Sequence, residues 1–239
     1  MVLAAGRGER MRPLTDHTPK PLLSVRGQAL MRWHLQALAK AGVSRVVINT
    51  AWLGEQIPQA LGEALHGPEG SELQLRYSHE GQDFGRALET AGGIVRALPQ
   101  LDEVFWVVAG DVFAPNMVFT QPAVARFAAS AALAHLWLVP NPTHNPGGDF
   151  GLSAAGQVLN LPKGSPDCAY TFSTVALYKK AFFADCGLPP GNPEGVALSL
   201  APLLRAAMDL GQVSGEVYAG DWTDVGTPQR LAQLNGSSA

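Results

Sequence analysis

The sequence predicts an α/β fold in three layers, with a mostly parallel sheet and helices on both of its faces. Short apolar runs typical of buried strands alternate with segments that have helical hydrophobic spacing. The strongest run, residues 104–108, is apolar at every position, as expected for a strand covered on both faces. A chain of 239 residues with 46 % hydrophobics can also bury a core of the size that such a fold needs.

The first half of the chain alternates regularly between predicted strands and helices. Residues 28–41 have the pattern of an amphipathic helix, and Gly42 stands at the usual stop position. The other elements expected here are a strand at 46–48, a helix at 53–65, a strand at 73–77, a helix at 90–98 and the strand at 104–108. Strands separated by helices are expected to pair in parallel.

The second half is less regular and predicts a small antiparallel extension of the sheet. The expected elements are a strand at 133–139, a loop at 140–148, strands at 158–161 and 170–178, a helix at 198–210, a strand at 213–218 and a helix at 227–234. Residues 235–239 are expected to fray. Because no repeat or linker divides the chain, residues 1–239 are expected to form a single domain.

A cationic, glycine-rich segment follows the first short apolar run. Gly6 and Gly8 lack a Cβ and can take positive φ, so the backbone N–H groups there can close around an anion. The positive charges of this segment are Arg7, Arg10, Arg12 and Lys20. Three prolines stop the segment from continuing as a helix. The segment suits a polyphosphate, and a basic surface loop with incidental glycines is the alternative interpretation.

Charge and composition limit the classes of partner that the chain is expected to bind. Residues 1–26 hold five Lys/Arg against two Asp/Glu, whereas the whole chain carries a net charge of −3. A local basic site in an acidic chain suits a small anion better than a nucleic acid. Two cysteines make no disulfide scaffold, and no apolar run reaches membrane-spanning length, so we expect a cytoplasmic protein without a membrane partner. We expect a monomer by default, and a few strand residues upstream of Met1.

Other familiar chemistries lack their signatures. The dinucleotide fingerprint needs a third glycine where Met11 stands, and the Walker A pattern needs a Gly-Lys-Ser/Thr that is absent. The six histidines form no zinc-spaced pair, and His34 is interpreted as a helix-face residue. No Gly-x-Ser-x-Gly elbow occurs.

Two aspartates are candidate metal ligands. Asp111 follows the 104–108 strand and Gly110, so its carboxylate is expected to project from the strand end at which α/β sheets bind ligands. Asp224 has a similar setting just before the last predicted helix. Each could instead be an ordinary turn or capping residue. Beside a polyphosphate, however, Mg²⁺ is typically held by one or two carboxylates.

The segment from Leu3 to Pro21 resembles the signature of the sugar-phosphate nucleotidyltransferases. That signature is Leu-Ala-(Gly/Ala)-Gly-x-Gly-x-Arg-(Leu/Met)-x-Pro-Leu-Thr, followed by Pro-Lys-Pro. The resemblance implies a Rossmann-like fold of the nucleotide-diphospho-sugar transferase type. It further implies a nucleotide-binding half at residues 1–112 and a sugar-binding half at residues 113–239.

The same resemblance implies roles for individual residues. Asp111 and Asp224 are expected to bind Mg²⁺, Arg10 to contact the triphosphate, and Lys20 to contact the α-phosphate and the incoming phosphate. The expected nucleotide contacts are Leu3, Ala4, Ala5, Gly6, Gly8, Glu89, Thr90 and Gly110. The sugar is expected near Asp149 and Ser173. The small residues at 87–93 would let a base lie against backbone, or they could serve only for close helix packing.

The chemistry expected of such a site follows from charge. The phosphate of a sugar 1-phosphate is largely ionised at pH 7, so it can attack a nucleotide without a general base. The difficulty is to bring two anions together and to stabilise the leaving pyrophosphate. A metal ion, a cationic loop and in-line positioning of the two substrates would overcome this difficulty.

Further runs extend the resemblance over nearly the whole chain. They are Asn49-x-Ala51-Trp52-Leu53-Gly54, Gly148-Asp149-Phe150, Thr171-Phe172-Ser173 and residues 200–205 and 213–216. These runs look like one branch of the family, the N-acetylmuramate α-1-phosphate uridylyltransferases of peptidoglycan recycling. The expected substrates are therefore UTP and a sugar 1-phosphate. Mannose-1-phosphate guanylyltransferases, glucose-1-phosphate uridylyl- or thymidylyltransferases, and a non-catalytic nucleotide-sugar-binding regulator are the alternatives.

Overall fold

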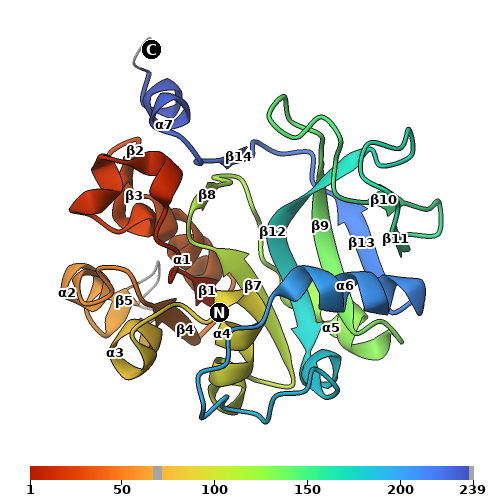
Figure 1. Cartoon of the computed structure of the whole chain (residues 1–239), viewed down its shortest axis with the longest axis horizontal. Coiled ribbons are helices and arrows are strands. Elements are labelled where there is room, and N and C mark those ends of the chain that lie inside the picture. The colour runs from red at the N-terminus through yellow and green to blue at the C-terminus, as the bar shows by residue number, and fades with distance from the viewer. Residues whose placement is uncertain (67–71, 237–239) are drawn as a thin grey trace.

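An eight-stranded sheet crosses the computed structural model, which describes residues 1–66 and 72–236 (Figure 1). Its strands, in spatial order, are β13 (Val213–Val217), β9 (Ala134–Pro140), β12 (Tyr170–Lys179), β7 (Val104–Ala109), β1 (Val2–Leu3), β4 (Arg45–Thr50), β6 (Glu72–His79) and β5 (Ala64–His66). Strands from both halves of the chain therefore share one sheet.

The pairing confirms the predicted sheet. β7, β1, β4 and β6 are parallel, while β12 runs antiparallel to its neighbours β7 and β9. β13 is parallel to β9, and β5 is antiparallel to β6. The small antiparallel pairs are β10 (Gly151–Leu152) with β11 (Val158–Leu159), β14 (Thr223–Asp224) with β8 (Val112–Phe113), and β2 (Ser24–Val25) with β3 (Gln28–Ala29).

Helices cover both faces of the sheet, because the side chains of β7 alternate between two apolar clusters. Trp106 and Val108 pack with α1 (Leu30–Lys40), α2 (Gln56–Leu61) and α5 (Gln121–Ala129). Phe105 and Val107 pack with α4 (Glu89–Ala97) and α6 (Leu200–Asp209) on the other face. The remaining helices are α3 (Glu80–Phe84) and α7 (Pro228–Leu234), with 3₁₀ turns at Glu9–Met11, Leu14–Asp16, Lys20–Leu22, Leu98–Gln100 and Lys180–Phe183. The three-layer prediction is therefore confirmed.

A third apolar cluster joins the two ends of the chain. It packs Met11 of the cationic segment against Val225 and Leu231, beside the exit of β14. α7 lies next to β2 and β3 (Figure 1), where Asn235 accepts a hydrogen bond from Arg26 N at 2.7 Å. Asn235 is thus held in place, contrary to the expectation of a frayed tail, and residues 237–239 lie outside the described residues.

The predicted helix at 53–65 is wrong at both ends. Only Gln56–Leu61 is α-helical, and Gly62 ends it at a φ of 71°. The next residues form β5, in which the buried Leu65 pairs with Leu73 of β6. The apolar positions of residues 53–65 fit both the hydrophobic period of a helix and that of a strand. Gly62 was the signal that the helix ends there.

Helix α5 was missed by the sequence analysis. Its start is marked by Thr120, whose side-chain oxygen accepts a hydrogen bond from Ala123 N at 3.2 Å, and by a proline in the first turn. No helix in the described part of the chain has the length and apolar character needed to cross a membrane.

Candidate active site

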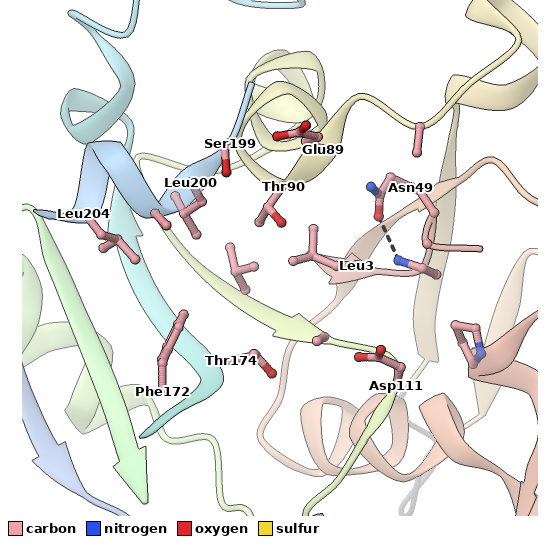
Figure 2. A pocket seen from close by; sticks show the side chains of 18 of the residues that line it. Leu3, Asn49, Glu89, Thr90, Asp111, Phe172, Thr174, Ser199, Leu200 and Leu204 are labelled. Atoms are coloured by element: carbon pink, nitrogen blue, oxygen red, sulfur yellow. Dashed lines mark hydrogen bonds between the residues drawn. The ribbon is translucent and has the colours of Figure 1, made fainter. Parts of the chain in front are cut away.

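The carboxyl ends of the central parallel strands open into a pocket of about 540 Å³. Figure 2 shows side chains from β1, β4, β12 and the starts of α4 and α6 facing into it. Its lining includes Leu3, Ala4, Ala5, Gly6, Gly8, Lys20, Asn49, Glu89, Thr90, Asp111, Asp149, Phe172, Thr174, Ser199, Leu200, Leu204 and Arg205. Most of the predicted nucleotide contacts therefore share one hollow, at the sheet edge where α/β folds bind ligands.

The glycine-rich segment folds back over Lys20. Gly8 has a φ of 67°, which favours glycine, and a Cβ added there would make a tight contact of 3.2 Å with Lys20 Cβ. Thr15 Oγ1 donates to Gly8 O at 2.9 Å, and Trp52 Nε1 donates to Thr15 O at 2.8 Å. The guanidinium carbon of Arg7 lies 3.6 Å above the Trp52 ring. These contacts hold the loop at the rim of the pocket.

Lys20 lies between the two candidate metal ligands. Its Nζ is 2.6 Å from Asp111 Oδ2 and 3.8 Å from Asp224 Oδ1. The Lys20 side chain is only 7 % exposed, while that of Asp111 is 38 % exposed. The β8–β14 pair brings the aspartates together, because Asp224 is in register with Val112, the residue after Asp111. Three residues far apart in sequence thus converge at the pocket mouth.

Asp224 has two further neighbours, Arg230 and His144, that the sequence analysis did not identify. Arg230 Nη1 donates to Asp224 Oδ2 at 2.8 Å and to Asp224 O at 2.7 Å. His144 Nε2 lies 3.7 Å from Asp224 Oδ2, and burial followed by the Arg230 charge lowers the pKa of His144. The capping Thr227 accepts from Arg230 N, which places Arg230 in the first turn of α7. The sequence signal for the position of Arg230 was therefore the helix cap at Thr227 and not a binding motif.

The donor set at this point fits a Mg²⁺ ion. Asp111 and Asp224 each direct a carboxylate oxygen at the Lys20 ammonium nitrogen, at 2.6 Å and 3.8 Å, so the two carboxylates face one common position. Within residues 1–66 and 72–236, no group of three or more His, Cys, Asp or Glu side chains could hold a metal. Mg²⁺ commonly uses one or two carboxylates and fills its other positions with substrate phosphates and water.

Arg10 is placed differently from Lys20. It is exposed and does not line the pocket. Its charge contributes to the lowered pKa of His144, so it lies on the Asp224 side of the mouth. The structure therefore places Lys20 at the aspartates, with Arg10 at the rim.

The start of α4 forms one wall of the pocket. Glu89 and Thr90 line it, and Glu89 has a φ of 58°, which is uncommon for a residue with a Cβ. A Cβ on Gly92 would lie 2.6 Å from Val196 O, and one on Gly93 would lie 2.5 Å from Glu80 Oε1. The close-packing interpretation therefore applies to the two glycines, while Ala87, Glu89 and Thr90 line the pocket.

On the opposite wall of the pocket, formed by β12, the structure corrects one predicted sugar contact, Ser173. Ser173 is 1 % exposed, and its hydroxyl donates to Trp137 O at 2.6 Å instead of facing the pocket. Side chains alternate along β12 through the irregularity between Phe172 and Val175, so Phe172 and Thr174 line the pocket while Ser173 faces the other side of the sheet. Figure 2 shows both side chains on this wall. The sugar contact was assigned to Ser173 from the family resemblance alone, without using the alternation of side chains along the strand.

Asp149 does line the pocket, but its carboxylate is already engaged. Oδ2 accepts from Phe172 N and Oδ1 accepts from Asn145 Nδ2, both at 3.0 Å. Arg205 of α6 lies beside it and donates to Asn160 Oδ1 at 2.6 Å. Lys20 and Arg205 are the cationic side chains of the lining. The 200–205 run had been noted in the sequence without a role for Arg205.

His34 lies on the buried face of α1. Its Nε2 is 2.8 Å from Val112 O, and because a carbonyl only accepts, Nε2 carries the proton. Burial lowers the pKa of His34 and so favours the neutral ring. This contact fixes α1 against β8, immediately after Asp111.

A family model described as nucleotidyl transferase matches residues 1–238. The chain belongs to the nucleotidyl transferase family. It is 46 % identical to an N-acetylmuramate alpha-1-phosphate uridylyltransferase of Neisseria meningitidis serogroup B, over 98 % of this chain and 95 % of the relative. It is 33 % identical to a Caulobacter vibrioides protein of the same name, over 96 % of this chain and 92 % of that one.

A solved structure has a similar fold. A Bacillus anthracis protein described as a putative glucose-1-phosphate thymidylyltransferase superposes with a TM-score of 0.76, covering 98 % of this chain and 92 % of the other. Sequence identity is 20 %, so this likeness concerns the fold. It agrees with the Rossmann-like prediction.

Replacing Asp111 with Asn in this nucleotidyl transferase is expected to lower pyrophosphate release by on the order of a hundredfold or more. The amide keeps an acceptor for Lys20, and Asp224 keeps a negative charge beside it, so the variant should still fold while it loses the charge that a cation needs. Asp102→Asn is the control, because Asp102 lies just before the other end of β7 and is exposed. Equal activity of the two variants would contradict a role for Asp111 in the site.

Thr174→Gly is expected to raise thermal stability and to weaken sugar 1-phosphate binding. Thr174 has a φ of 67°, which a β-branched residue adopts only with strain of about 1–3 kcal/mol. Glycine relieves that strain and removes a pocket contact. Arg26→Gly is the matched control, because Arg26 has a φ of 51° in the β2–β3 turn and does not line the pocket. A higher melting temperature with unchanged KM for Thr174→Gly would mean that the strain has no function.

Proposed function

We propose that the protein transfers the uridylyl group of UTP to N-acetylmuramate α-1-phosphate, giving UDP-N-acetylmuramate and pyrophosphate. The observation that carries this proposal is the 46 % identity, over almost the whole of both chains, to a relative with that name. The peptidoglycan-recycling branch suggested by the sequence runs is the same one. We place the reaction in the cytoplasm, in keeping with the two free cysteines.

The proposed step is an in-line displacement at the α-phosphorus of UTP. An ionised oxygen of the sugar 1-phosphate forms the new P–O bond, and the bond to the β-phosphate breaks with release of pyrophosphate. No general base is needed, because the attacking phosphate is already largely deprotonated at neutral pH.

The residues of the pocket would share this work. The glycine-rich segment would bind the triphosphate through its backbone N–H groups, and Lys20 would hold the α-phosphate and the attacking phosphate. Asp111 and Asp224 would hold Mg²⁺, which supplies positive charge against the phosphates when bound. Arg10 at the rim would meet the outer phosphates. We propose that residues 1–112 mainly bind the nucleotide and residues 113–239 the sugar.

Arg205 supports an acidic sugar. N-acetylmuramate carries a lactyl carboxylate, and an arginine is the side chain best suited to bind a carboxylate through two parallel hydrogen bonds. Arg205 lies on the α6 side of the pocket with Asp149 and Phe172, away from the segment that would hold the triphosphate. Its stack over Phe150, at 5.2 Å, fixes the direction of the guanidinium group.

A pyrophosphate-release matrix tests the proposal. Four nucleoside triphosphates are combined with the 1-phosphates of N-acetylmuramate, N-acetylglucosamine, glucose and mannose, each with and without Mg²⁺. UTP with N-acetylmuramate 1-phosphate and Mg²⁺ should give the highest kcat/KM. Preference for GTP with mannose 1-phosphate would contradict the substrate assignment, and nucleotide binding without turnover would indicate a regulatory protein.

Arg205→Gln is expected to raise KM for N-acetylmuramate 1-phosphate about tenfold or more, the cost of one lost charged contact. The KM for N-acetylglucosamine 1-phosphate, which lacks the carboxylate, should change little and serves as the internal control. Equal losses with both sugars would show that Arg205 supports the pocket wall and does not read the acidic group.

A further inference from the structure

Three buried hydrogen bonds connect the two segments that would bind the nucleotide. Ala4 N in the glycine-rich segment donates to Asn49 Oδ1 at 2.9 Å, which Figure 2 draws as a dashed line. Asn49 Nδ2 donates to Glu80 Oε1 at 2.8 Å. Leu88 N, just before the pocket-lining Glu89, donates to Glu80 Oε2 at 2.8 Å. Glu80 thus stands between the phosphate side and the nucleoside side of the pocket.

The donors in this chain of hydrogen bonds fix its protonation pattern. A backbone N–H can only donate, so Ala4 sets the orientation of the Asn49 amide, whose nitrogen then faces Glu80. Leu88 N–H faces the other carboxylate oxygen. Both oxygens of Glu80 are therefore acceptors, which is the arrangement of an ionised carboxylate. The side chain is buried, and burial raises the pKa of Glu80, whereas the hydrogen bonds from Leu88 and Asn49 and the charge of Arg96 on α4 act to lower it.

The connection continues to α6. Leu88 O accepts from Leu198 N at 3.0 Å, and Leu198 O accepts from Ala91 N at 2.9 Å. Leu198 lies two residues before α6, which carries Arg205. The segments expected to hold the phosphates, the nucleoside and the sugar are thus linked through one buried carboxylate.

We propose that Glu80 is a positioning residue for nucleotidyl transfer: it sets the separation between the glycine-rich segment and the nucleoside wall, and contacts no substrate itself. The inference rests on the proposed function of the pocket. A carboxylate is required because a side chain with two acceptors is needed between two fixed donors. An amide has only one, and turning the Asn49 amide would merely move the donor–donor contact to Ala4.

The test is a cycle of isosteric exchanges. Glu80→Gln leaves one N–H donor facing another, and Asn49→Asp leaves two carboxylate oxygens facing each other. The double variant rebuilds every bond. Its new carboxylate at position 49 would accept from Ala4 N and from the new amide at position 80, whose oxygen would accept from Leu88 N. It also keeps the net charge of the pair. Such a reciprocal exchange isolates the pairwise interaction.

Each single variant should raise KM for the nucleoside triphosphate and lower kcat/KM about tenfold or more. The double variant should be about tenfold more active than Asn49→Asp, which carries the same carboxylate at this pocket-lining position. The assay uses whichever triphosphate the wild type prefers, so a preference other than UTP would overturn the proposed function and leave this test intact. Leu73→Ala, in the buried part of β6 away from the pocket, is the control for stability loss alone.

The outcomes separate positioning from simple stabilisation. Single variants that lose melting temperature as Leu73→Ala does, with an unchanged KM, would overturn the proposal. If a single variant does not fold, the double variant decides alone. A folded double variant with wild-type KM supports the proposal, and a double variant that is neither more active nor better folded than Asn49→Asp overturns it.

Discussion

The site depends on one buried ammonium group held between two carboxylates. Asp111 and Asp224 would repel each other at the mouth of the pocket without the positive charge of Lys20. The lysine, in turn, could not be buried at 7 % exposure without its partners. Each group therefore requires the other two, and they come from the beginning, middle and end of the chain. The site forms only when the whole fold has formed.

Apolar packing supplies the rigidity that this charge arrangement needs. Met11 packs against Val225 and Leu231, so the segment that carries Lys20 is fixed to the segment that carries Asp224. On the pocket walls, Glu89 and Thr174 both have positive φ. Strained residues of this kind persist where the surrounding structure over-determines them, and here both lie where a ligand would bind. The favourable packing of the core thus offsets the unfavourable backbone conformations of Glu89 and Thr174 at the pocket.

The predictability of the molecule differs between its parts, for physical reasons. The parallel sheet and its covering helices follow from apolar periodicity, and the convergence of Lys20 with the aspartates follows from strand-end placement and the family resemblance. Ser173 was misplaced because the family resemblance located the strand end but not which of its alternating side chains face the pocket. The roles proposed for Glu80 and Arg205 depend on contacts between distant segments, and no local pattern encodes such contacts.

The most direct test of the account is the position of one metal ion. A crystal containing the protein, Mn²⁺ and a non-hydrolysable UTP analogue would locate the ion by its anomalous scattering. The account predicts one Mn²⁺ bound by both Asp111 and Asp224 and by the nucleotide phosphates, with Lys20 Nζ on the α-phosphate. An ion bound by only one of the aspartates, or a Lys20 directed away from the phosphates, would contradict it.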